Sequence, residues 1–400
     1  MNGRIIHREL TELAKTLFSK YPIVTITGPR QSGKTTFVRN AFPELDYVNL
    51  EDMEERRFAR DDPKEFLRQH AGGAVIDEVQ NVPDLTSWLQ VDVDERGGCG
   101  HFILTGSRQF EVMEAVSQSL AGRTAMLKLL PFSIEELRSG GFDVDYNDLL
   151  FRGFYPRIYD AGIDPARLLS DYISTYIERD LRKLSQVHNL SLFEKFLGLC
   201  AGRVGQVLNV SSLANDTGIT HTTASQWLTL LQAGYIVYLL KPYHGNLNKR
   251  LIKSPKLYFY DTGLASRLLG IEKTEHVLRH PLRGNLFENL VVGELLKYRY
   301  NRGMSDTLYF YRDRKGNEVD VIYEVGGLPF PVEIKAGATL NRDYFSGIRH
   351  FVRGVAEPNP YTAYEGLLVY AGERVEQRSS IHITHPAKLS TTLGSLESSP

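Results

Sequence analysis

Short apolar runs alternate with helix-compatible stretches over the first third of the chain. Five short apolar runs are expected to be strands, at 23–27, 47–50, 74–76, 102–105 and 125–130. The stretches between them are expected to be helices, at 34–41, 63–70, 84–94 and 111–120. Alternation of this kind predicts an α/β domain with a mainly parallel sheet covered by helices. Because Pro131 ends the last strand, this domain is expected to span residues 1–132.

The middle of the chain has the periodicity of helices. Apolar side chains recur at helical spacing over 167–184, and a helical connector is expected at 133–190. Residues 191–245 then follow the order of a winged helix: a helix at 211–216, a turn at Gly218, a helix at 222–233 and a strand at 235–240.

The second helix of this predicted winged helix is the candidate for contact with nucleic acid. Such a helix can lie in the major groove of DNA. The side chains expected on its exposed face are His221, Thr222, Ser225 and Gln226. Because the helix carries no Lys or Arg, contact with protein is the favoured alternative to contact with DNA.

A basic linker and a second α/β domain are expected to follow. The stretch 241–283 holds nine Lys or Arg residues against three acidic residues, and 246–283 is expected to be a linker that can meet phosphates. The last domain, at 284–388, is expected to contain a helix at 286–300 and strands at 307–311, 318–324, 331–335 and 366–370. The Ser- and Thr-rich end, 389–400, is expected to be a flexible tail.

A glycine-rich segment follows the first strand with the spacing of a phosphate-binding P-loop. It consists of Gly28, Pro29, Arg30, Gln31, Ser32, Gly33, Lys34 and Thr35, with Thr36 next in the expected helix. Its backbone N–H groups and the positive end of that helix suit phosphate oxygens. Lys34 is expected to reach the β- and γ-phosphates of ATP, and the Thr35 hydroxyl to ligate Mg²⁺. The segment therefore predicts nucleotide binding, with ATP and Mg²⁺ as cofactors.

Acidic and hydroxyl side chains follow two further expected strands. Asp77 is expected to help hold Mg²⁺, and Glu78 to polarise the attacking water. Thr105 or Ser107 is expected to sense the γ-phosphate or that water; alternatively, Ser107 only caps the next helix. Arg123 is a candidate transition-state cation, acting in cis or from a neighbouring subunit of a homo-oligomer. A surface ion pair is an equal alternative for this arginine.

These motifs resemble those of the AAA-type ATPases. The chain is more narrowly similar to a large group of prokaryotic ATP-binding proteins that combine an AAA domain with a carboxyl-terminal domain of unknown function. The phrases that carry the resemblance spread over most of the chain: ITGPRQSGKTT, YVNLED, AVIDEVQ, FILTGSRQF, LAGRTAMLKLLPFSIEEL, YISTYIERDL and KLYFYDTGLASRL. The resemblance implies an ATP-dependent switch. By position, the resemblance implies the Walker A role for Lys34 and Thr35, the Walker B role for Asp77 and Glu78, and the sensor role for the region of Ser107.

A second set of charged side chains lies in the last expected domain. Glu333 and Lys335 share one face of an expected strand, and Asp320 projects from the strand before it. With Glu288 on the helix upstream, this order resembles the PD-(D/E)XK, or restriction-endonuclease-like, nuclease fold. The resemblance implies a second Mg²⁺ or Mn²⁺ held by Asp320, Glu333 and Glu288, with Glu294 as a weaker alternative, and Lys335 as a catalytic residue. Ordinary cross-strand pairs of a β-hairpin are the alternative interpretation.

Composition narrows the class of protein. The chain has 400 residues, with 47 Lys and Arg against 48 Asp and Glu, and this balance argues against a protein that coats nucleic acid. Cys99 and Cys200 lie far apart and in no metal-ligand spacing, which favours a reducing cytoplasm. No run of about 18 apolar residues exists, and the first residues lack the apolar core of a signal peptide, so no membrane partner is expected.

Two functions are left open by these patterns. In the first, ATP binding and hydrolysis govern a carboxyl-terminal module that is nuclease-like and contacts DNA or another nucleic acid. In the second, the ATPase regulates the assembly of partner proteins, and the carboxyl-terminal module binds without cleaving. The first function requires Asp320, Glu333 and Lys335 to converge near Glu288.

Overall fold

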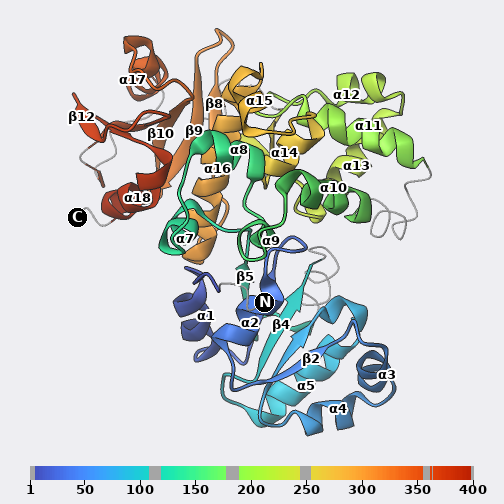
Figure 1. The fold of residues 1–400 in the computed structure, drawn as a ribbon. Helices are drawn as coiled ribbons and strands as arrows, with labels where there is room; N and C mark the ends of the chain where they lie inside the picture. The colour runs from blue at the N-terminus through green and yellow to red at the C-terminus, as the bar shows by residue number, and fades with distance from the viewer. Residues whose placement is uncertain are drawn as a thin grey trace.

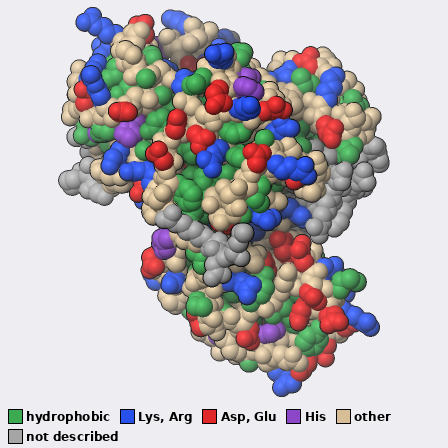
Figure 2. All heavy atoms as spheres, viewed as in Figure 1, with side chains coloured by type: hydrophobic (Ala, Val, Ile, Leu, Met, Phe, Trp, Pro, Cys, Tyr) green, Lys and Arg blue, Asp and Glu red, His purple; other side chains and the backbone are tan. Residues whose placement is uncertain are grey.

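The computed structural model describes residues 5–107, 119–176, 189–243, 254–354, 361–362 and 364–397. An amino-terminal α/β part, blue and cyan in Figure 1, lies below a larger part that contains the rest of the chain. Within the described ranges, no helix is both long enough and apolar enough to cross a lipid bilayer. Acidic and basic side chains are interspersed over the face shown in Figure 2, in agreement with the balanced composition.

The amino-terminal part is built on a parallel sheet. Its five described strands lie in the order β2-β3-β4-β1-β5, and all neighbouring strands run parallel. The strands are β1 (Ile23–Thr27), β2 (Asp46–Asn49), β3 (Ala74–Asp77), β4 (Phe102–Gly106) and β5 (Thr124–Lys128). All five predicted strands are therefore confirmed, with small shifts at their ends. Because β4 lies between β1 and β3, the carboxyl ends of these three strands meet at one edge of the sheet.

Helices cover both faces of this sheet. Successive strand residues point to opposite faces, so the apolar residues of each strand are buried beneath helices on both sides. The helices are α1 (Thr11–Phe18), α2 (Lys34–Ala41), α3 (Met53–Asp61), α4 (Pro63–Gln69) and α5 (Leu85–Arg96). Val75 packs in the core beneath α1 and α2, whereas Ala74 and Ile76 pack beneath α3, α4 and α5. The predicted helices at 34–41, 63–70 and 84–94 are confirmed, but the sequence pattern did not predict α1 and α3. Most of the helix predicted at 111–120 lies outside the described residues.

The larger part begins with helices. They are α7 (Ile134–Ser139), α8 (Tyr146–Arg152), α9 (Pro156–Tyr159), α10 (Pro165–Tyr176), α11 (Leu190–Ala201), α12 (Val210–Thr217) and α13 (His221–Ala233). Asn209 and Thr220 cap the amino ends of α12 and α13 with their side chains, and Gly218 ends α12 with φ of +90°. The two helices and the turn predicted at 211–233 are therefore confirmed. Residues 177–184 of the long helix predicted at 167–184 lie outside the described residues.

A mixed sheet joins the helical middle to the last part of the chain. Its eight described strands lie in the order β12-β13-β11-β10-β9-β8-β6-β7. They are β6 (Val237–Pro242), β7 (Lys256–Phe259), β8 (Tyr309–Arg312), β9 (Glu318–Val325), β10 (Leu328–Lys335), β11 (Gly366–Tyr370), β12 (Glu376–Arg378) and β13 (Ile381–Thr384). Because β6 pairs with both β7 and β8, the strand predicted for the winged helix belongs to the same sheet as the last domain.

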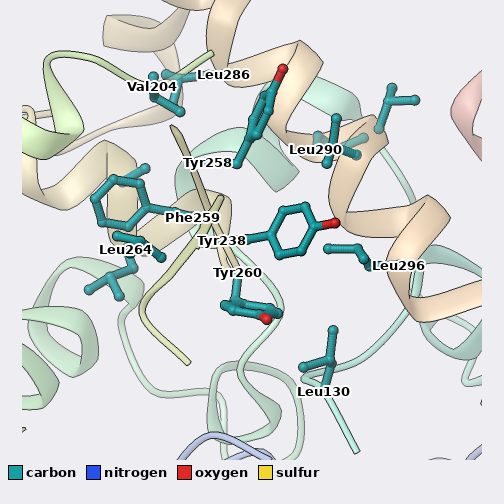
Figure 3. Packing of buried hydrophobic residues seen from close by; sticks show 14 of the residues in the cluster. Leu130, Val204, Tyr238, Tyr258, Phe259, Tyr260, Leu264, Leu286, Leu290 and Leu296 are labelled. Carbon is teal, nitrogen blue, oxygen red and sulfur yellow. The ribbon is translucent and has the colours of Figure 1, made fainter. Parts of the chain in front are cut away.

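The main hydrophobic core of the larger part extends from Leu130 to Leu396 and includes Ile6, and two smaller clusters lie beside the mixed sheet. Its remaining helices are α14 (Thr262–Leu268), α15 (Thr274–Arg279), α16 (Arg283–Asn301), α17 (Ser346–Gly354) and α18 (Leu389–Glu397). Figure 3 shows aromatic side chains of β6, β7 and the residue after β7 beside leucines of α16; the labelled residues include Tyr238, Tyr258, Tyr260, Leu290 and Leu296. The boundaries predicted at 190, 245 and 283 therefore do not separate independent cores.

Two segments predicted to be irregular are folded. The predicted basic linker, 246–283, includes β7, α14 and α15, and Lys256 within it is buried. The predicted flexible tail forms α18, whose Leu389, Leu393 and Leu396 are buried in the core. Leucines spaced four and three residues apart share one face of a helix, and the Ser and Thr residues between them conceal this pattern.

Candidate functional site

The glycine-rich segment connects β1 to α2 as a tight loop. A side chain on Gly28 would come within 2.1 Å of the carbonyl oxygen of Leu129, just after β5. Gly33 begins α2 with φ of +89°, in the left-handed region that glycine adopts readily. Gln31, between them, also has a positive φ, of +59°. This backbone course ends at the amino terminus of α2, which carries the positive end of the helix dipole.

Lys34 folds back over this loop. Its buried ammonium donates to the carbonyl oxygens of Gly28 and Pro29, at 2.9 Å and 2.8 Å. Desolvation by burial lowers the pKa of Lys34 to about 8; the carboxylates of Glu78 and Asp77 oppose this shift, and nearby Arg30 adds to it. The loop thus holds a cation whose charge is only partly compensated.

Three hydroxyl groups hold the carboxylate of Asp77 at the end of β3. Thr35 donates to Oδ2 at 2.7 Å, and Tyr47 of β2 donates to the same oxygen at 2.6 Å. Thr105 of β4 donates to the other oxygen, Oδ1. Burial and the bond to Asp77 raise the pKa of the Tyr47 phenol, so it stays a donor at neutral pH. Thr35 and Asp77, which were both predicted to hold Mg²⁺, are thus in contact, whereas Tyr47 was not predicted.

Glu78 projects from the same edge of the sheet. Its backbone has φ of +58°, which is uncommon for a residue with a side chain and often marks a functional position. Ser107 Oγ donates to its carboxylate, at 2.9 Å to Oε2, and Gln80 Nε2 donates to the same oxygen. Ser107 therefore contacts the acid that is the candidate base. The alternative role of Ser107, capping the next helix, concerns residues outside those described.

Arg8, which the sequence pattern did not indicate, ties the loop to α7. Its buried guanidinium donates to the carbonyl oxygens of Ser32 at 3.0 Å and Leu130 at 2.5 Å, and to the carboxylate of Glu136 at 3.0 Å. Arg8 also lines a cavity of about 320 Å³ beside α2. Gly33, Thr36, Phe37, Phe132 and Pro156 are among its other walls. A cavity that combines aromatic, apolar and polar wall residues suits a flat organic ring.

The residues present fit a nucleotide with Mg²⁺. Thr35 and Asp77 offer neighbouring oxygen ligands, the kind that Mg²⁺ prefers. Ser32 Oγ is buried in the loop and has no hydrogen-bond partner among the described residues, which fits a donor to a phosphate oxygen. The cavity continues from the same loop past Gly33 and Thr36, where a base attached to the phosphates could lie.

Arg123 lies at the wrong end of the sheet for a role in cis. Its carbonyl oxygen accepts from the backbone N–H of Ile23, at the start of β1, whereas the P-loop follows the end of that strand. Five strand residues span roughly 16 Å. Its guanidinium forms an exposed ion pair with Asp94, at 2.7 Å and 2.6 Å. The predicted cis role is therefore wrong, and the predicted surface ion pair is confirmed.

The second predicted site is brought together only in part. Lys335 Nζ lies 2.7 Å from Glu333 and 3.2 Å from Asp320, so these three side chains converge as predicted. Glu288 instead accepts from Lys256 at 2.9 Å, and Glu294 pairs with Lys297 on its own helix. Across the described part of the chain, no three His, Cys, Asp or Glu side chains are grouped so that they could hold a metal ion. The predicted metal set of Glu288, Asp320 and Glu333 is thus not found as a group of metal ligands; each of these carboxylates has a lysine ammonium as a partner.

Three family models match successive parts of the chain. Residues 20–138 match the model described as an AAA domain, which includes the P-loop, Asp77, Glu78 and Ser107. Residues 143–275 match a domain of unknown function, DUF8612, and residues 283–389 match another, DUF4143. The P-loop and the acidic pair therefore lie within the AAA match, whereas Arg8 and Pro156 of the cavity lie outside it.

Two mycobacterial proteins are similar over most of their length. One is "Uncharacterized protein Rv2008c" of Mycobacterium tuberculosis, 32% identical over 340 residues, which are 84% of this chain and 75% of that protein. The other is "Uncharacterized protein Mb2031c" of Mycobacterium bovis, with the same identity and coverage.

A partial likeness also exists to one solved structure, the Walker-type ATPase PABY2304 of Pyrococcus abyssi. It is 16% identical in sequence, with a TM-score of 0.47, and the alignment covers 66% of this chain and 96% of that chain. The AAA match, rather than this likeness, connects the loop and the acidic pair with ATP.

Proposed function

The chain belongs to the same family as the two mycobacterial proteins and is an ATP-binding protein of the AAA type, and from this premise we propose that it is a Mg²⁺-dependent ATPase switch. One observation carries the proposal: Thr35 of the P-loop donates to Asp77 at 2.7 Å, while the neighbouring Glu78 accepts from Ser107. A phosphate-binding loop, a pair of Mg²⁺ ligands and a positioned base thus meet at one edge of the sheet.

Each residue has a defined task in this proposal. The backbone of residues 28–33, the start of α2 and the Lys34 ammonium bind the phosphates. Thr35 and Asp77 would hold Mg²⁺, which neutralises charge on the phosphate oxygens when it is bound. Glu78 orients a water molecule and accepts its proton, and Ser107 fixes the orientation of the Glu78 carboxylate. The cavity next to Thr36 and Phe37 receives the base.

Affinity for ATP is expected to fall as pH rises through about 8. Burial lowers the pKa of Lys34 to about 8 in the nucleotide-free protein, and only the protonated ammonium attracts phosphate. The group is charged below this pKa and neutral above it, so affinity should fall by up to about tenfold for each further pH unit. Calorimetric titration between pH 7.5 and 9.5 measures this, with Lys34→Arg as the control because Arg stays protonated throughout. A flat affinity for the protein with Lys34 would contradict the expectation.

We propose that the nucleotide state reaches the larger part of the chain through Tyr235. This buried residue lies between α13 and β6, and its hydroxyl is 2.9 Å from Oγ1 of Thr27, the residue before the P-loop. The ring of Tyr235 contacts Tyr260, which in turn contacts Tyr238 of β6. A shift of the P-loop would therefore act on α13 and on one strand of the mixed sheet.

Hydrogen exchange of the full chain tests this coupling. Saturating MgATP is expected to protect the P-loop and α2, and to change exchange in α13 and β6 as well. Tyr235→Phe removes the hydroxyl but keeps the ring, so it should keep the protection at the P-loop and reduce the change at α13, since the hydrogen bond between Tyr235 and Thr27 is lost. If MgATP left hydrogen exchange in α13 of the unsubstituted protein unchanged, this result would contradict the proposed switch but not the proposed ATPase activity.

The larger part is proposed to act as a regulatory or interaction module. The order α12, Gly218, α13 and the antiparallel pair β6 and β7 supports a winged helix. Ala224, Trp227, Leu228 and Leu231 bury one face of α13, and the exposed face carries no Lys or Arg. This favours a protein partner over DNA. Cleavage of nucleic acid, DNA binding and assembly into a homo-oligomer remain predictions.

A further inference from the structure

A buried lysine lies among the carboxylates of the second predicted site. Lys256 is the first residue of β7, and only 2% of its surface is exposed. Its Nζ is 2.9 Å from Oε1 of Glu288 on α16 and 2.5 Å from Oε1 of Glu318 at the start of β9. The hydroxyl of Tyr258 donates to the same oxygen of Glu288, at 2.5 Å. One ammonium group therefore joins three elements that are far apart in the sequence.

A second lysine balances a further part of the negative charge of this cluster. Lys335 bridges Glu333 and Asp320, and Asp320 also accepts from the backbone N–H of Ile334 at 2.8 Å. Each of the four carboxylates, those of Glu288, Glu318, Asp320 and Glu333, thus has an ammonium partner within 3.2 Å. Buried carboxylates require such partners, because an unpaired buried charge is very costly.

At Glu333 the cluster also has little room for a hydrated ion. The backbone of α17 covers Glu333 so closely that a side chain on Gly347 would lie 1.8 Å from its Oε1. Glu333 itself is 4% exposed. Mg²⁺ in nuclease-type sites usually keeps several water ligands and also needs access to a phosphate of the substrate. The arrangement therefore does not fit a catalytic metal ion.

We propose that Lys256 is the resident cation of this cluster. Its ammonium takes the position among the carboxylates that a divalent metal would need, and so converts a nuclease-like set of residues into a structural joint. The joint fixes β7 to α16 and β9. Because β7 pairs with β6, it also holds the predicted winged helix onto the mixed sheet. The inference is independent of ATP hydrolysis at the P-loop.

Metal binding by matched variants tests the proposal. Mn²⁺ binding is followed by electron paramagnetic resonance in nucleotide-free full-length protein that carries Asp77→Asn, which removes the ligand near the P-loop. No Mn²⁺ is expected to bind at the cluster in this background or with Lys256→Arg, which keeps the charge. Lys256→Met keeps most of the side-chain volume without the charge, so it should lower the melting temperature and gain one Mn²⁺ site. Adding Glu288→Gln should abolish that site, and Lys273→Met, at an exposed lysine, should change neither property.

Mn²⁺ binding by the protein that retains Lys256 also tests the proposal, so the test does not depend on whether Lys256→Met folds. Stoichiometric Mn²⁺ binding with Lys256 present, lost on Glu333→Gln or Asp320→Asn, would overturn the proposal. Cleavage of DNA or RNA with Mn²⁺ that depends on Asp320 and Lys335 would overturn it as well. A folded Lys256→Met protein with unchanged melting temperature and no gained metal site would show that the ammonium is not needed there.

Discussion

Replacing Glu78 by Gln should lower the rate of ATP hydrolysis by about 10²–10⁴-fold, the usual contribution of a general base. The amide cannot accept the proton of the attacking water, whereas its size and its contact with Ser107 are kept. Because Glu78 does not belong to the phosphate-binding loop, ATP should still bind. Phosphate release under saturating MgATP measures the rate, and calorimetric titration measures the binding.

A matched substitution separates this effect from a general change of charge. Glu55→Gln removes an exposed carboxylate from α3, so its phosphate release should match that of the unsubstituted protein. The assignment of Glu78 would be wrong if Glu78→Gln hydrolysed ATP within a factor of about three of the Glu55→Gln protein, far from the loss expected of a missing base.

Replacing Arg8 by Ala should lower the free energy of unfolding by about 3 kcal/mol, the lower end of the cost of breaking a buried ion pair. The loss leaves Glu136 without its cation and the carbonyl oxygens of Ser32 and Leu130 without their donor. Glu136 keeps two backbone donors, Glu9 and Ser133, which is why the lower end is expected. Because Ser32 belongs to the P-loop, affinity for ATP should fall in the same variant.

Urea unfolding of Arg8→Ala and Arg57→Ala tests this prediction. Arg57 forms an exposed ion pair with Asp61, and such pairs contribute between about 0 and 1 kcal/mol. Arg8→Lys keeps the charge but cannot reach three acceptors at once. Its free energy of unfolding should therefore lie between those of Arg8→Ala and the unsubstituted protein. Equal stability of the Arg8→Ala and Arg57→Ala proteins would show that Arg8 does not tie the loop to α7.

Local patterns predicted the phosphate site well. The bounds of β1 and α2 agree with the prediction, because an apolar β-branched run, a glycine-rich turn and a helix start are all local signals. Asp77 and Glu78 lie where expected because parallel strands align their carboxyl ends. Tyr47 is a polar residue on β2, the strand beside β3, and this position is a signal that could have indicated its contact with Asp77.

Contacts between distant residues could not be predicted in this way. Arg8 and Glu136 are 128 residues apart, and nothing in their local sequence indicates that they pair. Lys256 looked like part of a basic surface, but its neighbours Leu257, Tyr258 and Phe259 form a buried strand that draws it into the core. The sequence did not indicate that β6 and β8 belong to one sheet, because 66 residues of chain, from 243 to 308, separate the two strands.

Phosphate release by the purified full chain with MgATP, beside Lys34→Ala, tests the central claim most directly. The unsubstituted protein is expected to release phosphate continuously. Lys34→Ala should fall to the level of a blank, because the loop then lacks the cation that faces the phosphates. Equal release by both proteins, or no release by the unsubstituted one, would contradict an ATPase at this site.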